Sequence, residues 1–348
     1  MEQLKAIFEK FAKPKSASSV GLDIGNSSVK VVQLLTRPGS LFKELVNFDI
    51  QRFKSQKATD ITLAIKKSLE NAQISSKLVN TSVSGQAVIV RYVQMPKMTK
   101  EELLKALKFG LGKYIPFDLN EVNYDFQILG DSGEGKGQKM MKVLLVAVKK
   151  EVIEERIKIL KNAGLTPGVI DVDSFAIVNS FKLVQQENKG IIAVLDIGAD
   201  ITSTTILRNN IPHFNRDIPI GGRHLTKASI EEFELTEAEA DELKHNPKDR
   251  YGDLISAIRS VLDSIASEIQ KSFNYAESQM GGSVQKIFLT GGTAKFKGID
   301  KVLKSIIGID VEVWDPTRIL QINPELSKER LIEVGPLLTV SVGLALRG

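Results

Sequence analysis

Two acidic residues in this chain each follow an apolar run and precede a glycine turn, an arrangement that can bind phosphate and metal. The first, Asp23, lies in Val20–Leu34, which predicts two strands joined by the polar turn Gly25–Ser28. A glycine in such a turn lets backbone N–H groups approach a phosphate closely. A carboxylate repels phosphate, so Asp23 would act through hydrated Mg²⁺, whereas the Lys30 ammonium could contact phosphate oxygens. Taken alone, the segment is better explained as a structural β-hairpin.

The same pattern returns about half a chain length later, which changes this interpretation. Gly190–Leu207 repeats the apolar run, the letters Leu-Asp-Ile-Gly with Asp196, a short polar turn and a β-branched strand. Such a spacing relates two domains rather than short repeats. Two halves that each offer an Asp-bearing hairpin predict one ligand held between them. A third segment, Ile287–Ile299, is an apolar strand ending in Gly291 and Gly292, where the backbone could pack against a flat ring or a sugar.

These three segments resemble the first phosphate, second phosphate and adenosine motifs of the actin-like ATPase superfamily, in that family's order. The resemblance implies an α/β fold of the actin-like (ribonuclease H-type) class, with two duplicated lobes and with ATP and Mg²⁺ as cofactors. Asp23 and Asp196 would hold the metal, mainly through water. The implied nucleotide contacts are Gly25, Asn26, Ser27, Ser28, Lys30, Gly198, Ala199, Asp200, Ile201, Thr202, Gly291, Gly292, Thr293 and Ala294.

Three further residues are candidates for the nucleotide site, and each also has an ordinary structural explanation. Asp173 falls where the superfamily has a water-orienting residue, but a carboxylate there also suits the first turn of a helix. Ala240–Lys244 resembles a ribose- or adenine-contacting helix of FtsA-like and MreB-like proteins, with Asp241 in place of a glutamate. Asp241 and Lys244 are also spaced for a surface ion pair. Whether ATP is hydrolysed, and at what rate, stays open, and a weak Mg-dependent ATPase is one outcome.

Composition excludes several classes of protein. Of 348 residues, 42% are hydrophobic and 26% charged, which is ordinary for a soluble globular chain. The absence of cysteine excludes disulfides and thiolate metal sites, and the three scattered histidines argue against a zinc site. There is no apolar stretch of about 20 residues and no signal-peptide core, so we expect a cytoplasmic protein. The net charge of +5 permits contact with anionic lipid or acidic proteins, but the basic–aromatic interleaving of a nucleic-acid surface is missing.

The chain order predicts a small α/β subdomain inserted into the first lobe. A helix begins at Thr99 with Glu102 three residues later, the pattern of a capping box. Residues 1–15 form a basic amphipathic pattern that suits either a membrane surface or, slightly better, a terminal helix packed beside the first sheet. The predicted units are 1–17, an N-terminal amphipathic segment; 18–94 with 166–188, the first-lobe core; 95–165, the inserted subdomain; 189–228 with 284–348, the second-lobe core; and 229–283, a helical subdomain.

The position of the insertion resembles the FtsA and PilM branch of the superfamily. Met95–Leu103, Lys113–Phe117 and Tyr124–Phe126 look more like the PilM family of type IV pilus assembly proteins. Membership of that family would imply a cytoplasmic, ATP-binding scaffold that is peripheral to the inner membrane. Such a scaffold has a nucleotide-dependent conformation and binds the N-terminal tail of PilN, a bitopic membrane protein. Other platform components, motor ATPases and self-association are further implied partners.

Two alternatives belong to other functional classes. An FtsA-like cell-division protein would add a basic amphipathic membrane helix after its core, and we expect none after the final Leu344–Gly348. A small-molecule kinase of the same superfamily would need larger substrate lids and a transfer base that faces the cleft.

Overall fold

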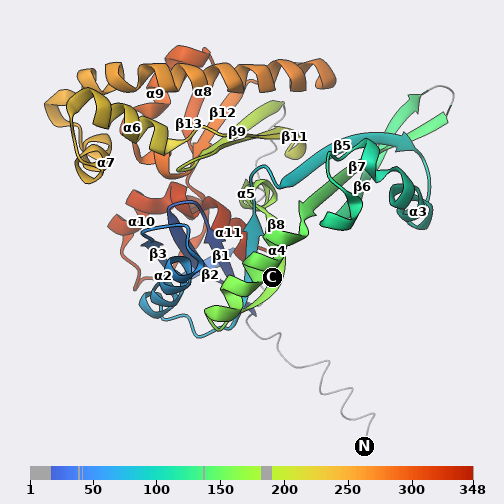
Figure 1. Ribbon diagram of the computed structural model, residues 1–348, viewed down its shortest axis with the longest axis horizontal. Coiled ribbons are helices and arrows are strands. Elements are labelled where there is room, and N and C mark those ends of the chain that lie inside the picture. The colour runs from blue at the N-terminus through green and yellow to red at the C-terminus, as the bar shows by residue number, and fades with distance from the viewer. Residues whose placement is uncertain (1–16, 38–39, 41, 136–137, 182–189, 348) are drawn as a thin grey trace, which may run out of the picture.

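Two lobes and a smaller unit beside them make up the molecule (Figure 1). The computed structural model describes residues 17–37, 40, 42–135, 138–181 and 190–347. The N-terminal helix predicted within residues 1–15 therefore lies outside the described residues. The sequence also predicts a helix at 172–185 that links the two halves of the chain, and its part beyond Phe181 lies outside them as well. No helix in the described part of the chain combines the length and the apolarity needed to cross a bilayer.

The first lobe is built on a six-stranded sheet in the order β14-β3-β2-β1-β4-β8. The strands β1, β2 and β3 pair in antiparallel fashion, in agreement with the predicted hairpin, and β4 and β8 extend the sheet with parallel pairing. Apolar residues alternate along β2, so Val29 and Val31 pack under α2 and α4 while Val32 and Leu34 pack under α10 and α11. The bounds are β1 (Ala17–Ile24), β2 (Ser28–Thr36), β3 (Lys43–Arg52), α2 (Ala58–Asn71), β4 (Leu78–Val83), α4 (Lys150–Asn162), β8 (Thr166–Val172), β14 (Gln321–Ile322), α10 (Lys328–Val334) and α11 (Thr339–Ala345).

The second lobe repeats the plan with a five-stranded sheet in the order β11-β10-β9-β12-β13. The spacing of Ile258, Leu262, Ile265 and Ile269 in the sequence predicts a helix with one apolar face toward the core, and the long helix α8 buries these residues against this sheet, as predicted. The bounds are β9 (Ile191–Ile197), β10 (Thr202–Arg208), β11 (Ile211–Ile218), α6 (Gly222–Phe233), α7 (Glu237–His245), α8 (Tyr251–Met280), β12 (Lys286–Thr290), α9 (Ile299–Ile307) and β13 (Asp310–Val313).

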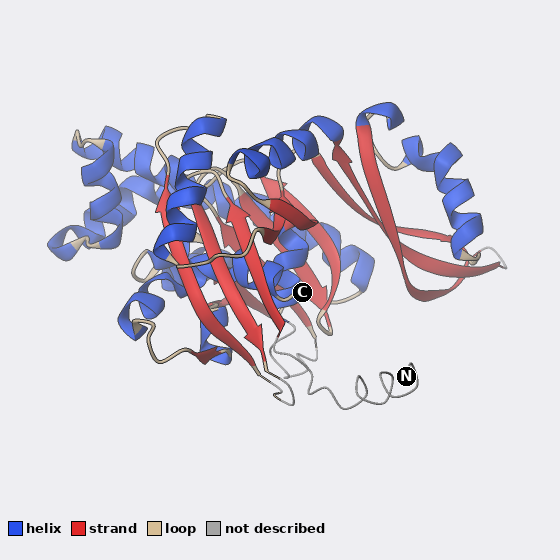
Figure 2. Ribbon diagram, turned by 90° about the horizontal axis from the view of Figure 1, so that it is seen from below, coloured by secondary structure: helices blue, strands red, loops and turns tan. Residues whose placement is uncertain are grey.

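The inserted subdomain stands apart as a three-stranded sheet with one helix (Figure 2). The capping box is present, because the Thr99 and Glu102 side chains each accept a hydrogen bond from the other residue's backbone N–H. The boundaries differ from the predicted 95–165: β5 pairs with β7 from Val88 onward, and α4 packs its Leu160 into the first-lobe core. The bounds are β5 (Val88–Pro96), α3 (Lys100–Gly110), β6 (Val122–Gly135) and β7 (Gln138–Lys149).

Two helices, α5 (Asp173–Phe181) and α11, cross where the lobes join. They touch through small residues: a Cβ on Gly343 would lie 1.7 Å from the carbonyl oxygen of Ala176. The predicted second-lobe segment 284–348 includes α10 and α11, which pack Leu331 and Val342 on the first-lobe sheet, while Val340 and Leu344 of α11 pack with second-lobe strands. The polar, proline-ended sequence at 320–324 predicts a loop, but it contains the short strand β14, which pairs with β3. A long apolar stretch near a chain end does not reveal which of two sheets it covers.

Candidate functional site

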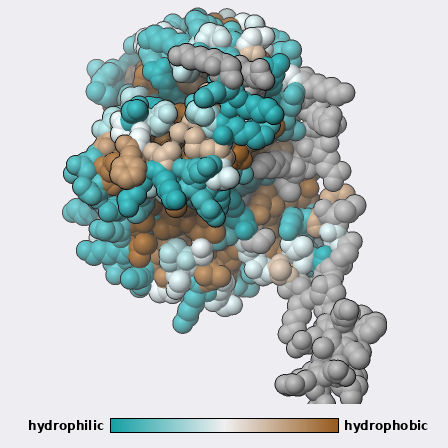
Figure 3. All heavy atoms as spheres, turned by 90° about the vertical axis from the view of Figure 1, so that its right-hand side faces the viewer, coloured by the Kyte–Doolittle hydropathy of each residue, from teal (hydrophilic) through white to brown (hydrophobic). Residues whose placement is uncertain are grey.

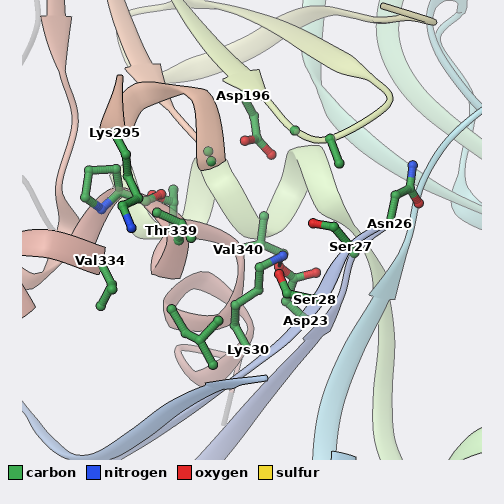
Figure 4. Close-up of a pocket in the computed structure, with 18 of the residues that line it drawn as sticks. Asp23, Asn26, Ser27, Ser28, Lys30, Asp196, Lys295, Val334, Thr339 and Val340 are labelled. Carbon is green, nitrogen blue, oxygen red and sulfur yellow. Dashed lines mark hydrogen bonds and ion pairs between the residues drawn. The ribbon is translucent and has the colours of Figure 1, made fainter. Parts of the chain in front are cut away.

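A cleft of about 350 Å³ lies between the two lobes and is lined by both hairpin turns identified in the sequence. Figure 4 shows Lys30 and Asp23 pointing into it from one side and Asp196 from the opposite side. Lys295 enters from the second lobe beyond them. The cleft therefore joins residues that are far apart in sequence.

The first hairpin places an acid and a base side by side. Asp23 and Lys30 are opposite each other in the β1–β2 register, so their side chains share one face of the sheet. Lys30 Nζ lies 2.9 Å from Asp23 Oδ2. Gly25 closes the turn by donating its N–H to the Ser28 carbonyl at 3.1 Å, and a Cβ on Gly25 would lie 2.7 Å from Lys30 Nζ. The glycine thus leaves room for the ammonium group.

The second hairpin has the same geometry without the base. Asp196 is opposite Ser203 in the β9–β10 register, and Gly198 donates its N–H to the Ile201 carbonyl at 2.9 Å. The turn is held from outside, because the N–H of Arg223 at the start of α6 donates to the Ala199 carbonyl. No cation of this lobe forms an ion pair with Asp196 in the described part of the chain.

Gly291 brings the third motif against Asp196. Its φ of +89° favours glycine, and a Cβ there would lie 2.2 Å from Asp196 Oδ1. The parallel register puts Thr290 beside Asp196, so the glycine pair follows directly at the edge where both strands end. The backbone of Gly291 and Gly292 therefore forms part of the cleft wall.

Three carboxylates face one ammonium group in this cleft. Burial and the negative charge of Asp23 raise the pKa of Asp196 to about 7 and that of Asp173 to about 6. Burial would lower the pKa of Lys30, but the neighbouring Asp23 outweighs it and raises the pKa above its usual value. The raised pKa values of Asp196 and Asp173 show that a cation placed beside these carboxyl groups would stabilise their charged forms.

This arrangement fits a hydrated cation better than a directly ligated one. Among the described residues, no three acidic or histidine side chains are close enough together to hold a metal ion. Mg²⁺ usually keeps several of its waters and takes one or two carboxylates, with phosphate oxygens completing its shell. Asp23 and Asp196 could hold those waters, while the missing side chains of Gly25 and Gly291 let Lys30 and Asp196 lie close to the backbone of the cleft wall.

Several predicted site residues do not line the cleft. Thr202 is buried and donates its hydroxyl to the Ile220 carbonyl at 2.7 Å, because strand alternation turns Ser203, not Thr202, to the cleft. Asp200 pairs with Arg223 through both of its oxygens. Thr293 and Ala294 are buried behind Gly292.

Asp241 and Lys244 are paired with each other at 3.0 Å beside the cleft, as the ordinary alternative for them predicts. Asp241 Oδ2 also lies 2.6 Å from an Nη atom of Arg52, which comes from the other lobe. Burial would raise the pKa of Asp241, but the neighbouring Lys244 and Arg52 outweigh it and lower the pKa to about 2. Asp241 therefore bridges the two lobes.

Some cleft residues were not identified from the sequence. Arg156 of α4 lies near Asp173 and Asp23, and burial lowers its pKa. His245, at the end of α7, lines the cleft, as do Arg330 and Glu333 of α10. Lys295 could have been found, since it stands in the third motif itself, but no local pattern marks the others.

Known proteins resemble this chain in sequence and in fold. A sequence model of the type IV pilus assembly protein PilM family matches residues 21–348. The solved structure of a PilM-PilN type IV pilus biogenesis complex contains a chain that is 30% identical, with a TM-score of 0.82 over 94% of this chain and 98% of that one.

More distant relatives share the fold. FtsA, the cell division protein of Streptococcus pneumoniae, is 24% identical over 87% of this chain and 77% of its own. MreB5 of Spiroplasma citri, solved bound to ADP, has a TM-score of 0.52 at 10% identity over 95% of both chains. The actin-like fold predicted from the sequence is thereby confirmed, and the chain belongs to the PilM family of type IV pilus assembly proteins.

Proposed function

We propose that this protein is an ATP-binding scaffold of a type IV pilus inner-membrane platform and binds the N-terminal tail of a PilN-like membrane protein. The observation that carries the proposal is the match, over nearly the whole of both chains, to the PilM chain of a PilM-PilN complex. Attachment to the membrane would then come through the partner. Contacts with other platform components or motor ATPases, and self-association, belong to the same proposal.

The inserted subdomain offers apolar surface for a protein partner. Leu104 and Phe109 of α3 are 54% and 87% exposed, and Tyr124 and Ile128 of β6 are also exposed. Figure 3 views the side of the molecule that carries this subdomain, where apolar side chains are visible between polar ones. Exposed apolar surface of this kind is typical of protein interaction sites.

The partner proposal is tested by titrating a fluorescent peptide of the PilN-like N-terminal tail into the full chain. Binding with an affinity that changes on addition of Mg·ATP is the expected result. A variant that cannot bind nucleotide is the matched control, because its peptide affinity should not respond to Mg·ATP. Absence of binding in both states would refute the pilus role and leave the FtsA-like alternative, testable by sedimentation with anionic vesicles.

The nucleotide proposal rests on the cleft. Gly25–Ser28 and Gly198–Ile201 would hold the phosphates, Lys30 would neutralise their charge, and Asp23 and Asp196 would orient the waters of Mg²⁺. Asp23→Asn keeps the shape and should weaken Mg·ATP binding by about a hundredfold, or roughly 2.7 kcal/mol. Asp263→Asn removes the same charge from an exposed ion pair of α8, outside the cleft lining, and should change it less than about threefold. Equal losses in calorimetric titrations would contradict this assignment.

We further propose Asp173 as the residue that orients or deprotonates water if ATP is hydrolysed. It lines the cleft at the start of α5 with a pKa raised to about 6, which suits a base at neutral pH. Asp173→Asn should abolish phosphate release while Mg·ATP still binds. Unchanged turnover in that variant would leave Asp173 with its structural role at the helix start.

A further inference from the structure

A second groove lies between the second lobe and the inserted subdomain. Its volume is about 800 Å³, and β5 and β7 form one wall while β11 and the end of α8 form the other. Figure 1 shows β5 and β11, which line it, beside each other. We call it the lateral groove, and Arg91, Lys142, His213 and Tyr275 are among the residues that line it.

The lateral groove is positively charged. Arg91, Lys142, Arg216 and Lys271 line it, and no aspartate or glutamate does. Glu268, which is outside the lining, pairs with both Arg216 and Lys271. Arg91 and Lys142 form no ion pair within the described part of the chain. The surplus of cations favours an anionic occupant.

Lys142 contacts only neutral side-chain partners within the described residues. Its Nζ lies 2.7 Å from Nδ1 of His213 across the groove and 5.5 Å from the ring centre of Tyr92. Burial, together with Lys142 and Arg208, lowers the pKa of His213 to about 4, so this partner is a neutral imidazole. Burial also lowers the pKa of Lys142. A partly desolvated ammonium with only neutral partners is costly, and a carboxylate beside it would offset that cost.

The walls of the groove favour an extended chain. β11 is the last strand of the five-stranded sheet and β5 the last strand of the three-stranded one, and in the described structure neither has a hydrogen-bonded neighbour on its outer side, although the two strands contact each other. Free edges offer backbone N–H and C=O groups to an added strand. The Tyr275 ring, 59% exposed, packs on Phe214 with 5.4 Å between centroids and gives an apolar surface between the charges. The Tyr92 hydroxyl is buried and has no hydrogen-bond partner among the described residues, so it could also donate to a carboxylate.

We propose that the lateral groove binds an extended acidic segment of a partner protein, which lies along β11 and places carboxylates beside Arg91 and Lys142. The site is separate from the cleft between the lobes and from the exposed residues of α3 and β6, so it goes beyond the proposed function. An occupant would contact both the inserted subdomain and the second lobe and would therefore hold them in one relative orientation.

The test uses the full chain and three labelled hexapeptides, in which valine alternates with glutamate, glutamine or lysine. Fluorescence anisotropy should show the glutamate peptide binding at least about tenfold more tightly than the other two, since a charge-assisted contact to a half-buried cation exceeds a neutral one. Lys142→Met should weaken that binding about tenfold, whereas Lys304→Met, at an exposed lysine of α9, should leave it within about twofold. Hydrogen exchange should slow in β11 on binding.

Three results would overturn the proposal. These are equal affinities of the glutamate and glutamine peptides, indifference to Lys142→Met, or no binding of any peptide at about 1 mM, where even a weak specific site of roughly −4 kcal/mol is half filled. Displacement of the peptide by a short DNA duplex or by inorganic phosphate would point to another ligand class and would contradict it too. Lys142→Met should leave Mg·ATP and PilN-tail binding unchanged, so failure here is distinguishable from failure of the proposed function.

Discussion

The two hairpins share the letters Leu-Asp-Ile-Gly but differ in what stands opposite the aspartate. In the first lobe Lys30 faces Asp23 at 2.9 Å, and the pair is almost neutral as a unit. In the second lobe Ser203 faces Asp196, whose pKa burial and the Asp23 charge raise to about 7. One lobe therefore carries a charge-compensated site and the other a carboxylate that still lacks its counter-charge. The two copies of a duplicated motif can thus differ in role: the Asp23–Lys30 pair would contribute mainly to stability, and Asp196 would add affinity for a cation.

The largest effect should come from breaking the compensated pair. Lys30→Met leaves the Asp23 carboxylate buried and unpaired, which costs about 3–5 kcal/mol in the free energy of unfolding. Urea denaturation at pH 8 measures it, and the double variant with Asp23→Asn should recover most of the loss. A loss below about 1 kcal/mol would show that the pair is solvated like a surface pair.

A somewhat smaller effect should follow from Gly291→Ala in the second lobe. The added Cβ meets both an unfavourable φ of +89° and Asp196 Oδ1 at 2.2 Å. Gly308 has a similar φ of +81° with nothing within 4 Å of its Cβ position, so Gly308→Ala is the matched control for the strain alone. We expect about 1 kcal/mol for the control and about 3 kcal/mol for Gly291→Ala. Equal values would mean that Asp196 moves aside freely.

Asp196→Asn should have the opposite sign from Lys30→Met. The raised pKa means that the folded state keeps a proton on Asp196 between about pH 4 and pH 7, where the unfolded state has lost it. Stability from this group is thus present at low pH and lost as pH rises through 7. The variant should be more stable than the parent at pH 8, on the order of 2 kcal/mol, and no more stable at pH 4. Thermal unfolding across this pH range measures the difference.

The smallest effect should come from the contact between the lobes at Arg52 and Asp241. Arg52 is largely exposed, so Arg52→Gln should cost less than about 1 kcal/mol of stability. Because the contact bridges the lobes beside the cleft, its loss should speed nucleotide association about twofold to fivefold, measured by stopped-flow fluorescence. Arg259→Gln removes an exposed pair within α8 and is the control. Identical rates would show that the contact does not restrict entry.

Much of the fold follows from local pattern. The hairpins, the long helix α8 and the capping box at Thr99 each depend on residues that are close in sequence, and the structure has them where they were predicted. The errors concern long-range packing. That β14 joins the first-lobe sheet and that α4 packs on the first lobe depend on which surfaces meet, since an apolar face fits either sheet.

The candidate site divides in the same way. The sequence alone determined the two aspartates, the lysine and the glycine turns, because their chemistry and spacing lie within short segments. Only the tertiary structure decided that Ser203 rather than Thr202 faces the cleft, that Asp241 pairs with Arg52, and that Lys142 meets His213. Burial and the approach of charges from distant segments set these contacts and the raised pKa values, and neither quantity is a property of the local sequence.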